Sequence, residues 1–357
     1  MLWGLPMSVK HSVAAVLSRS GSGTLTSRTS QLRHHAFGSL CTALLLAANA
    51  GATGDALPDR SEFMTQHMPY AAFDRMPQDH LKVANAELSV AFVPGNLKLS
   101  HERILEWVGE RAQIVAGYYG QFPVDSARIL IVPVDGGGVK FGQSFGFRGA
   151  ALRVMVGETT SSAQLEDDWV LVHEMVHFAF PNIDDAQLWF QEGQATYIES
   201  VARVQSGDRP ATEVWKELVA QMPKGLPQPG DQGLDRTHTW GRTYWGGAVF
   251  CLVVDVEIRK RTQNRFGLQD ALRAVVRAGG VTTQNWPIEK ALDIGDRATG
   301  TTVLHDYYDK LKADPGTIDL NELWQRLGVR VDGTNVTFDD AAELAGARKA
   351  IMTRPAA

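Results

Sequence analysis

The chain has 357 residues, of which 44% are hydrophobic and 21% charged, and its formal net charge is −5. This apolar content excludes a disordered protein, and a count of two cysteines excludes a small disulfide-stapled fold. Four of the 35 basic residues and none of the 40 acidic residues lie in the first fifty positions. The remainder is therefore acidic, which argues against sequence-independent binding of nucleic acid.

The amino terminus predicts an export signal. Arg33 and two histidines precede an apolar run over about residues 37–50, and the run ends in Ala48-Asn49-Ala50, a small-polar-small cleavage pattern. This order is typical of a secretory signal peptide, and the run is shorter than the roughly 20 residues that cross a bilayer. We therefore expect residues 1–50 to be a signal peptide, although the position of the true start codon stays open. The mature protein is then expected to be exported (periplasmic or secreted) and to have no stable membrane span. The alternative is an uncleaved segment that anchors the chain at a membrane.

Strand and helix patterns alternate in the first half of the mature chain. Ser100 is placed to cap a helix, because apolar residues recur after it at helical spacing as far as Val115. A glycine-rich stretch follows Asp135 and continues to Gly149. Patterns typical of strands cover residues 86–94, 129–134 and 152–156. We expect a mixed α/β subdomain over residues 51–180.

Nearly every segment from residue 164 to residue 313 has the spacing of a helix. Helices are predicted over residues 164–180, 185–204, 211–221, 241–262, 267–278 and 301–313. The tail from Leu320 to Met352 predicts a helix, a short β segment over 329–338 and a second helix. The sequence therefore predicts an α+β protein, with a mainly helical subdomain over 181–315 and a C-terminal extension over 316–357.

The strongest chemical signal is His173-Glu174-Met175-Val176-His177. Residues four apart lie on one face of a helix, so both imidazoles can reach one metal ion. Glu174 stands about 100° around the helix, beside the metal, where a general base is needed. The flanking residues are apolar, and burying two imidazoles and a carboxylate without a partner is costly. The alternative is a pair of ordinary hydrogen-bonded core histidines.

A third metal ligand is expected on the next predicted helix. Two histidines leave a zinc site short of its third protein ligand, which in hydrolases is commonly a carboxylate. Glu192, in Trp189-Phe190-Gln191-Glu192-Gly193, can supply it; the alternative is a surface carboxylate on an amphipathic helix. Glu199 lies further along the same face, where it either accepts a hydrogen bond from a liganding histidine or has a structural role.

A third stretch, Thr243-Tyr244-Trp245-Gly246-Gly247-Ala248, precedes a long apolar helix. Together with the His-Glu-x-x-His helix and the Trp-x-x-Glu-Gly segment, in this order, it resembles the gluzincin zinc metallopeptidases. It is similar to the catalytic domain of the glycyl aminopeptidase family, which is peptidase MA-like, and more distantly to the aminopeptidase N type. The resemblance covers roughly residues 165–280, about a third of the chain.

The resemblance implies a thermolysin-like metallopeptidase core that hydrolyses peptide bonds with water activated by Zn²⁺. His173, His177 and Glu192 would hold the ion. Glu174 would take the proton of the attacking water and pass it to the leaving amine.

Tyr244 matches the tyrosine that hydrogen-bonds the tetrahedral intermediate in this family. The alternative is a packed aromatic residue at a helix start, and His238 competes for the same oxyanion-stabilising role. Tyr244, Cys251 and Asp255 share one helical face, so Asp255 is expected to be a buried carboxylate that supports the helix.

The sequence departs from the family pattern in three places. The interval between His177 and Glu192 is shorter than that of the aminopeptidase N type, so we expect a tight connection between the two helices. The Gly-x-Met-Glu-Asn-like segment, whose acid captures a free amino terminus, has no clear counterpart. In its place stands Gly142-Gln143-Ser144-Phe145-Gly146-Phe147-Arg148-Gly149, without a carboxylate. These glycines would permit an edge strand to pair closely with the substrate backbone. The PDZ module often found after this catalytic unit also has no counterpart, and the choice between amino- and endopeptidase stays open.

The favoured prediction is an exported zinc metallopeptidase that acts on a peptide or protein substrate and binds no nucleic acid. One alternative is a catalytically inactive gluzincin-like protein that keeps the metal site and only binds peptides or cell-wall fragments. Another is a structural exported protein whose histidines are buried in the core and hydrogen-bonded to other residues there. The sequence gives no indication of the oligomeric state.

Overall fold

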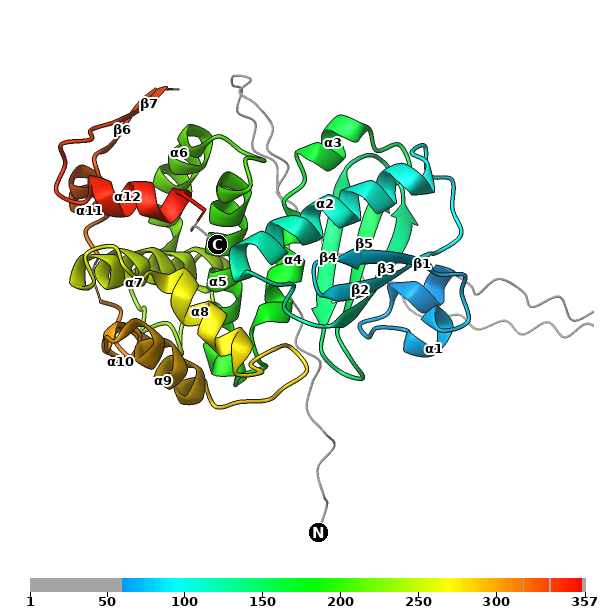
Figure 1. The fold of residues 1–357 in the computed structure, drawn as a ribbon, viewed down its shortest axis with the longest axis horizontal. Helices are drawn as coiled ribbons and strands as arrows, with labels where there is room; N and C mark the ends of the chain where they lie inside the picture. Colours follow the sequence, from blue (N-terminus) through cyan, green and yellow to red (C-terminus); the bar gives the residue numbers. More distant parts are fainter. Residues whose placement is uncertain (1–59, 317, 334, 355–357) are drawn as a thin grey trace, which may run out of the picture.

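The computed structural model describes residues 60–354 except 317 and 334. The predicted signal peptide, residues 1–50, lies outside this part of the chain. Two halves lie side by side in it (Figure 1), one built on a sheet and the other on helices. The predicted α+β class, with a mixed first half and a mainly helical second half, is confirmed. Within the described residues, no helix is both long enough and apolar enough to cross a membrane.

The first half is organised by a five-stranded sheet in the order β1-β2-β3-β5-β4. Its strands are β1 (Asp79–Val83), β2 (Ala86–Phe92), β3 (Ser126–Val134), β4 (Val139–Phe145) and β5 (Ala151–Gly157). The strands β2, β3 and β5 run parallel, and β1 and β4 pair antiparallel at the two edges. The glycine-rich segment thus forms an edge strand, as expected. The sequence pattern does not predict β1, because its side chains are mostly exposed and lack apolar alternation.

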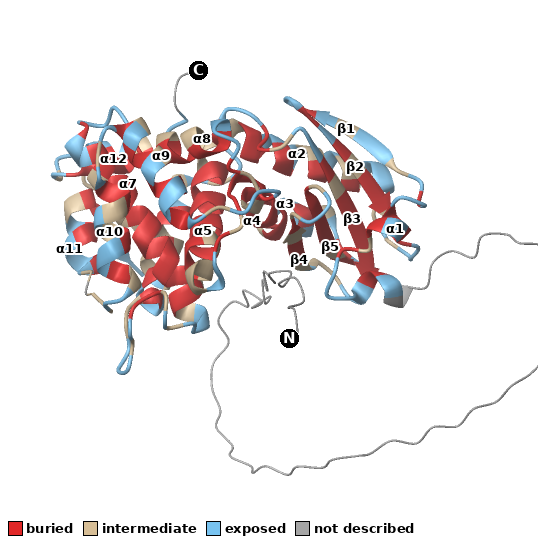
Figure 2. Cartoon of the chain, turned by 90° about the horizontal axis from the view of Figure 1, so that it is seen from below, coloured by how far each residue is buried: buried red, intermediate tan, exposed pale blue. Residues whose placement is uncertain are grey.

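Both faces of the sheet are covered at β2, β3 and β5, so these strands are largely buried (Figure 2). Ile129 and Ile131 of β3 face the main core, which includes the helix α2 (His101–Tyr119). Leu130, on the opposite side of the strand, belongs to a smaller cluster with η1 (Arg60–Met64) and α1 (Tyr70–Phe73). Alternate side chains of one strand therefore serve two cores.

The helix α2 begins and ends at its capping residues. The Ser100 hydroxyl accepts the Arg103 N–H at 3.2 Å, as the sequence predicts, and Gly120 ends the helix with a φ of 81°. In Figure 1 this helix lies in front of the sheet and reaches toward the helical half.

The predicted continuous helix over residues 164–180 is wrong. The segment forms three pieces, α3 (Ser162–Glu166), α4 (Val170–Val176) and the 3₁₀ turn η2 (His177–Ala179). The Asp168 carboxylate accepts the main-chain N–H groups of Val170 at 3.0 Å and Leu171 at 3.1 Å, and so it starts a new helix. Apolar spacing alone does not reveal this capping residue.

The second half consists of helices, and α5 and α7 are coloured mostly as buried in Figure 2. Its elements are η3 (Asp185–Gln187), α5 (Leu188–Gln205), α6 (Ala211–Gln221), η4 (Met222–Gly225), η5 (Gly241–Gly246), α7 (Gly247–Arg261), α8 (Leu268–Arg277), α9 (Ile288–Thr299) and α10 (Val303–Lys312). The sequence prediction omits α9, and η5 is a π-helix where an α-helix is predicted. The tail matches its prediction, with α11 (Leu320–Leu327), β6 (Val329–Asp332), β7 (Asn335–Phe338) and α12 (Ala345–Met352).

Two glycines let α5 and α7 touch backbone to backbone. A Cβ atom on Gly193 would lie 2.2 Å from the Gly247 Cα, and one on Gly247 would lie 2.1 Å from the Trp189 carbonyl oxygen. Neither contact leaves room for a methyl group. This crossing brings Glu192 of α5 next to η5, which carries Tyr244.

We expect Gly193→Ala to lower the free energy of unfolding by about 3 kcal/mol, because overpacking a closed contact costs that order of energy. Gly109→Ala is the matched control, since a Cβ there meets nothing within 4 Å. The control should raise stability by about 0.5–1 kcal/mol through better helix propensity. Urea unfolding measures both variants, and a Gly193→Ala protein as stable as the wild type would contradict the contact.

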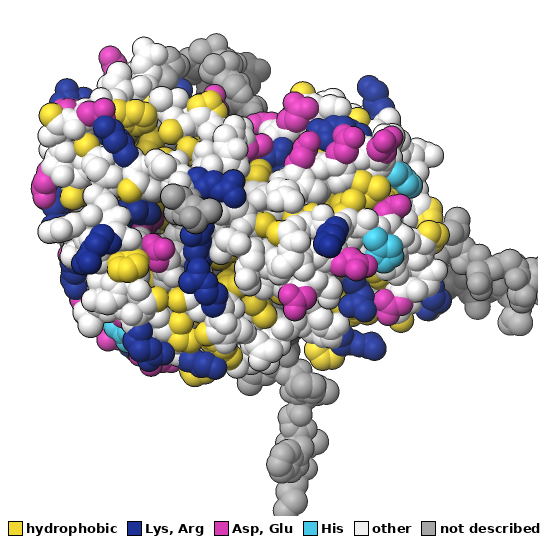
Figure 3. All heavy atoms as spheres, viewed as in Figure 1, with side chains coloured by type: hydrophobic (Ala, Val, Ile, Leu, Met, Phe, Trp, Pro, Cys, Tyr) yellow, Lys and Arg dark blue, Asp and Glu magenta, His cyan; other side chains and the backbone are white. Residues whose placement is uncertain are grey.

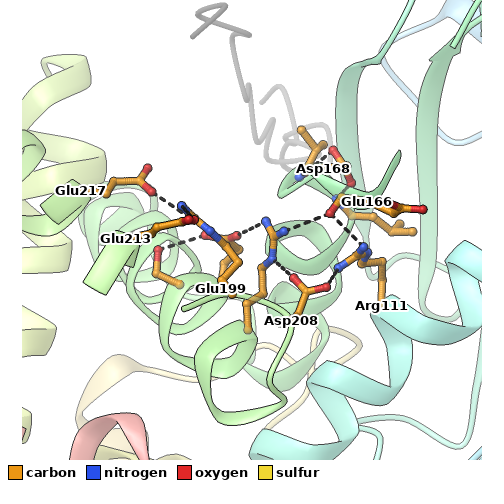
Figure 4. Close-up of polar contacts among 12 residues, drawn as sticks. Arg111, Glu166, Asp168, Glu199, Asp208, Glu213 and Glu217 are labelled. Atoms are coloured by element: carbon orange, nitrogen blue, oxygen red, sulfur yellow. Dashed lines mark hydrogen bonds and ion pairs between the residues drawn. The ribbon is translucent and has the colours of Figure 1, made fainter. Parts of the chain in front are cut away.

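Two buried arginines join the halves (Figure 4). Arg111 of α2 and Arg203 of α5 both bind the Asp208 carboxylate, and Arg111 Nη1 lies 2.6 Å from its Oδ1. Both guanidinium groups also donate to the main-chain oxygen of Glu166, at 3.1 and 3.2 Å. Because these bonds are charge-assisted and buried, they hold α2, α5 and the end of α3 together.

Asp168 lies beside this network, and burial raises its pKa to about 6. Two effects lower the pKa of Asp168: hydrogen bonds from the capping N–H groups of Leu171 and Val170, and the positive charges of Arg111 and Arg203. Together they lower it by less than burial raises it. The folded protein therefore holds this proton more tightly than the unfolded chain. The resulting stability is complete below the unfolded pKa near 3.8 and is lost as pH rises through about 6.

An Asp168→Asn variant keeps a capping oxygen and has no proton to lose. We expect the stability of the wild type, relative to this variant, to fall by about 2 kcal/mol between pH 4 and pH 7. Urea unfolding at several pH values measures the difference. A difference that stays constant across this range would show that the proton is held no more tightly in the folded state.

Candidate metal centre

Three of the predicted ligand residues meet between the two halves. His173 and His177 come from α4 and the first residue of η2, and Glu192 comes from α5. Glu192 Oε2 lies 3.3 Å from His173 Nε2 and 3.6 Å from His177 Nε2. One ligand atom from each residue lies within 4.8 Å of the others.

The short connection between α4 and α5 makes this meeting possible. Asn182 in this connection is held by the loop before α9: its side chain donates to the Thr282 carbonyl at 2.7 Å, and its main chain bonds Gln284 and Trp286. Gln191 donates back to the Pro181 carbonyl at 3.0 Å. The turn is therefore fixed by a distant part of the chain as well as by its own sequence.

Burial and charge act in opposite directions on these groups. Burial raises the pKa of Glu192, but the charge of His177 and hydrogen bonds from both histidines outweigh it and leave the pKa below its usual range. Burial lowers the pKa of His177, and the Glu192 carboxylate more than reverses this effect. The carboxylate is thus ionised and directed at two imidazole nitrogens.

This donor set fits a zinc ion. Two imidazole nitrogens and one carboxylate oxygen are the protein ligands of many catalytic zinc sites, in which a further position stays open. All three side chains are largely buried, which is the setting in which a cation compensates the desolvation of the carboxylate. Among the described residues His173 Nδ1 has no hydrogen-bond partner, so this histidine lacks the outer bond that liganding histidines usually make.

Glu199 does not supply that outer bond. Its carboxylate lies 3.1 Å from Arg203 Nη1 and accepts a hydrogen bond from Ser200, within the arginine network of Figure 4. Of the two roles considered for Glu199, the structure supports the structural one.

Glu174 is completely buried beside the histidines and faces the edge strand β4. Ser144 Oγ lies 3.0 Å from Glu174 Oε2 and 2.5 Å from its main-chain oxygen, while Oε1 has no partner among the described residues. Burial raises the pKa of Glu174, although the nearby histidines lower it. A carboxylate with a raised pKa is suited to accept a proton near neutral pH.

Sequence reasoning did not identify Ser144 as a partner of Glu174. The available signal is Gly142, two residues earlier and on the same face of β4. A Cβ on Gly142 would lie 2.5 Å from the Glu174 side chain and 2.7 Å from that of Val170. Glycine is therefore required where the edge strand approaches α4. This close approach places the Ser144 hydroxyl within hydrogen-bond distance of Glu174.

Tyr244 is half-buried on the π-helix η5, and its ring centroid lies 6.3 Å from that of His173. π-helical segments are often found at functional sites. His238, the competing candidate, is exposed. The expectation for Asp255 is confirmed: it is buried and accepts hydrogen bonds from the Tyr197 hydroxyl, Arg259 and the Leu268 N–H.

A cavity of about 790 Å³ opens beside His177 and Glu192. One wall is formed by residues 144–148, at the end of β4 and in the turn that follows it. The facing wall comes from the connection between α4 and α5, the start of α5 and the loop before α9, with Asn182, Ile183, Asp184, Asp185, Leu188, Gln191, Thr282, Thr283 and Asn285. The candidate metal centre is therefore accessible to a molecule much larger than water.

No protein-family model matches this chain, and a search of curated proteins finds no significant match. Solved structures do match its fold. An aminopeptidase N family protein from Idiomarina loihiensis has a TM-score of 0.53 and 15% identity, over 72% of this chain and 50% of that one. An M1 zinc metallopeptidase from Deinococcus radiodurans has a TM-score of 0.44 and 14% identity, over 68% of this chain and 51% of that one. The chain thus spans about half the length of the structures that it matches, and its fold is gluzincin-like.

Proposed function

We propose that this chain is an exported zinc metallopeptidase that hydrolyses peptide bonds. The observation that carries the proposal is the convergence of the ligand atoms of His173, His177 and Glu192 and the Glu174 carboxylate beside one open cavity. The fold supports it, because a solved structure that shares the fold is an aminopeptidase N family protein.

His173, His177 and Glu192 would hold the ion. When bound, zinc supplies a Lewis acid that makes water a nucleophile near neutral pH. Glu174 accepts the proton of the attacking water and transfers it to the leaving amine. Ser144 orients this carboxylate through its hydrogen bond to Oε2.

Tyr244 is proposed to donate a hydrogen bond to the oxygen on which negative charge develops. Such donors typically contribute a few kcal/mol to lowering the barrier. Its position on η5, stacked against His173, supports this assignment.

The organisation of the chain is part of the proposal. Residues 1–50 would be the signal peptide, 51–180 the α/β subdomain with the metal-binding helix, 181–315 the helical subdomain and 316–357 a C-terminal extension. The substrate would be a peptide or protein outside the cytoplasm.

On the face shown in Figure 3, acidic and basic side chains are interspersed without a large area of one sign.

A peptide-hydrolysis assay tests the proposal. The purified protein is incubated with a diverse peptide mixture, and mass spectrometry records new termini before and after treatment with a chelator. We expect cleavage that is lost on chelation and restored by zinc. Bound zinc without any cleavage would instead favour a catalytically inactive protein that binds peptides.

A further inference from the structure

Trp240 is an exposed aromatic side chain next to the candidate metal centre. It is 42% exposed and is one of the few large hydrophobic side chains that the described part of the chain leaves open to solvent. Its ring centroid lies 6.0 Å from that of Tyr244, which in turn stacks on His173. A row of three stacked rings therefore leads from the buried His173, a predicted metal ligand, through Tyr244 to the exposed Trp240.

The exposure of Trp240 belongs to a firmly held segment. Arg242, two residues later, is buried, forms an ion pair with Asp231 at 2.7 Å and donates to the Gly225 carbonyl at 2.6 Å. A Cβ on Gly241 would lie 2.3 Å from the Lys224 carbonyl oxygen, so this backbone is closely packed. The indole is thus presented at a defined position, which is what a recognition surface requires.

The cavity borders His177 and Glu192, and neither Tyr244 nor Trp240 is among the residues that line it, whereas the aromatic rings lie next to His173. Its wall carries Phe147, which is 72% exposed. One exposed aromatic side chain therefore lines the cavity beside His177 and Glu192, and a second, Trp240, is linked through Tyr244 to His173.

The charged groups near the candidate metal centre indicate which peptides fit. The cavity wall formed by residues 144–148 carries Arg148 and no carboxylate. The facing wall carries two exposed carboxylates, Asp184 and Asp185, and the first of them accepts the Ala186 N–H at 2.9 Å. Beside Trp240 stands a cation, with Lys224 Nζ 5.7 Å from the centre of the indole. An apolar side chain suits the indole, and a basic one is repelled by Lys224.

We propose that a peptide lies across the metal centre with residues on both sides of it, and that Trp240 receives one of its aromatic or large aliphatic side chains. This inference rests on the proposed peptidase function and extends it, because it assigns internal peptide bonds as the substrate. Trp240 is then a specificity-determining residue, and neither end of the peptide needs to be free.

Binding to a chain that carries Glu174→Gln tests the proposal without turnover. The probe is a fluorescent decapeptide with acetylated and amidated ends and a central Phe, compared with the same peptide carrying Ala or Lys there. We expect the Phe peptide to bind about tenfold more tightly than the Ala peptide, and the Lys peptide to bind no better than the Ala peptide. Adding Trp240→Ala should reduce the preference for Phe to less than about twofold, and Trp240→Phe should retain most of it.

Phe266→Ala is the matched control, since Phe266 is an exposed aromatic residue in the connection between α7 and α8. It should leave the preference unchanged. A preference for Phe that survives Trp240→Ala would overturn the role of Trp240. Peptides that bind only with a free amino or carboxyl end would overturn the placement across the centre. Hydrolysis by the wild type is measured separately, so failure of the proposed peptidase function would appear as binding without cleavage.

Discussion

Glu174→Gln is expected to reduce kcat for peptide hydrolysis by about 10³-fold or more while zinc content and fold are retained. General acid–base catalysis contributes about 10²–10⁴-fold, and here one carboxylate would act both on the attacking water and on the leaving amine. Glutamine has nearly the same shape, and its carbonyl oxygen can still accept the hydrogen bond from Ser144. What it loses is the ability to take up a proton.

Stability should not fall in this variant. Glu174 is completely buried and burial raises its pKa, so the ionised form carries a desolvation cost that glutamine avoids. Thermal unfolding and elemental analysis would accompany the kinetic measurement. Glu166→Gln is the control, because within the described residues this exposed carboxylate on α3 pairs only with Arg103, and the variant should keep wild-type activity. Full peptidase activity in Glu174→Gln would refute the assigned mechanism.

Glu192→Ala and His177→Ala are each expected to lose the bound zinc, and with it all measurable hydrolysis. Each substitution leaves two protein ligands where a catalytic zinc site uses three. The wild type should contain one zinc ion per chain, and chelation should lower its thermal stability, because a ligand that binds only the folded state stabilises it. His238→Ala removes an exposed imidazole and should keep both zinc and activity.

Elemental analysis of the four proteins decides this prediction. Zinc that persists at full occupancy in both ligand variants would place the ion elsewhere. Absence of zinc from the wild type after loading would leave a gluzincin-like fold without its metal, and a search for binding partners would then take priority over a substrate screen.

The sequence by itself determined the local parts of this site. Helical spacing sets which side chains share a face within one or two turns, so His173 and His177 could be paired, and Glu174 set beside them, from residue numbers alone. The Ser100 cap of α2 and the strands β2, β3 and β5 are likewise local patterns, and the structure confirms them.

Only the tertiary structure decided the contacts between distant segments. Glu192 was expected as a ligand from the sequence, but it reaches the histidines because the connection before α5 is tied to the loop before α9. Ser144, which was not expected, reaches Glu174 because Gly142 lets an edge strand approach α4. Such contacts depend on packing between elements far apart in sequence, which no period of three or four residues encodes. For the same reason Glu199, on the face predicted to meet the histidines, pairs with Arg203 instead, one turn away on its own helix.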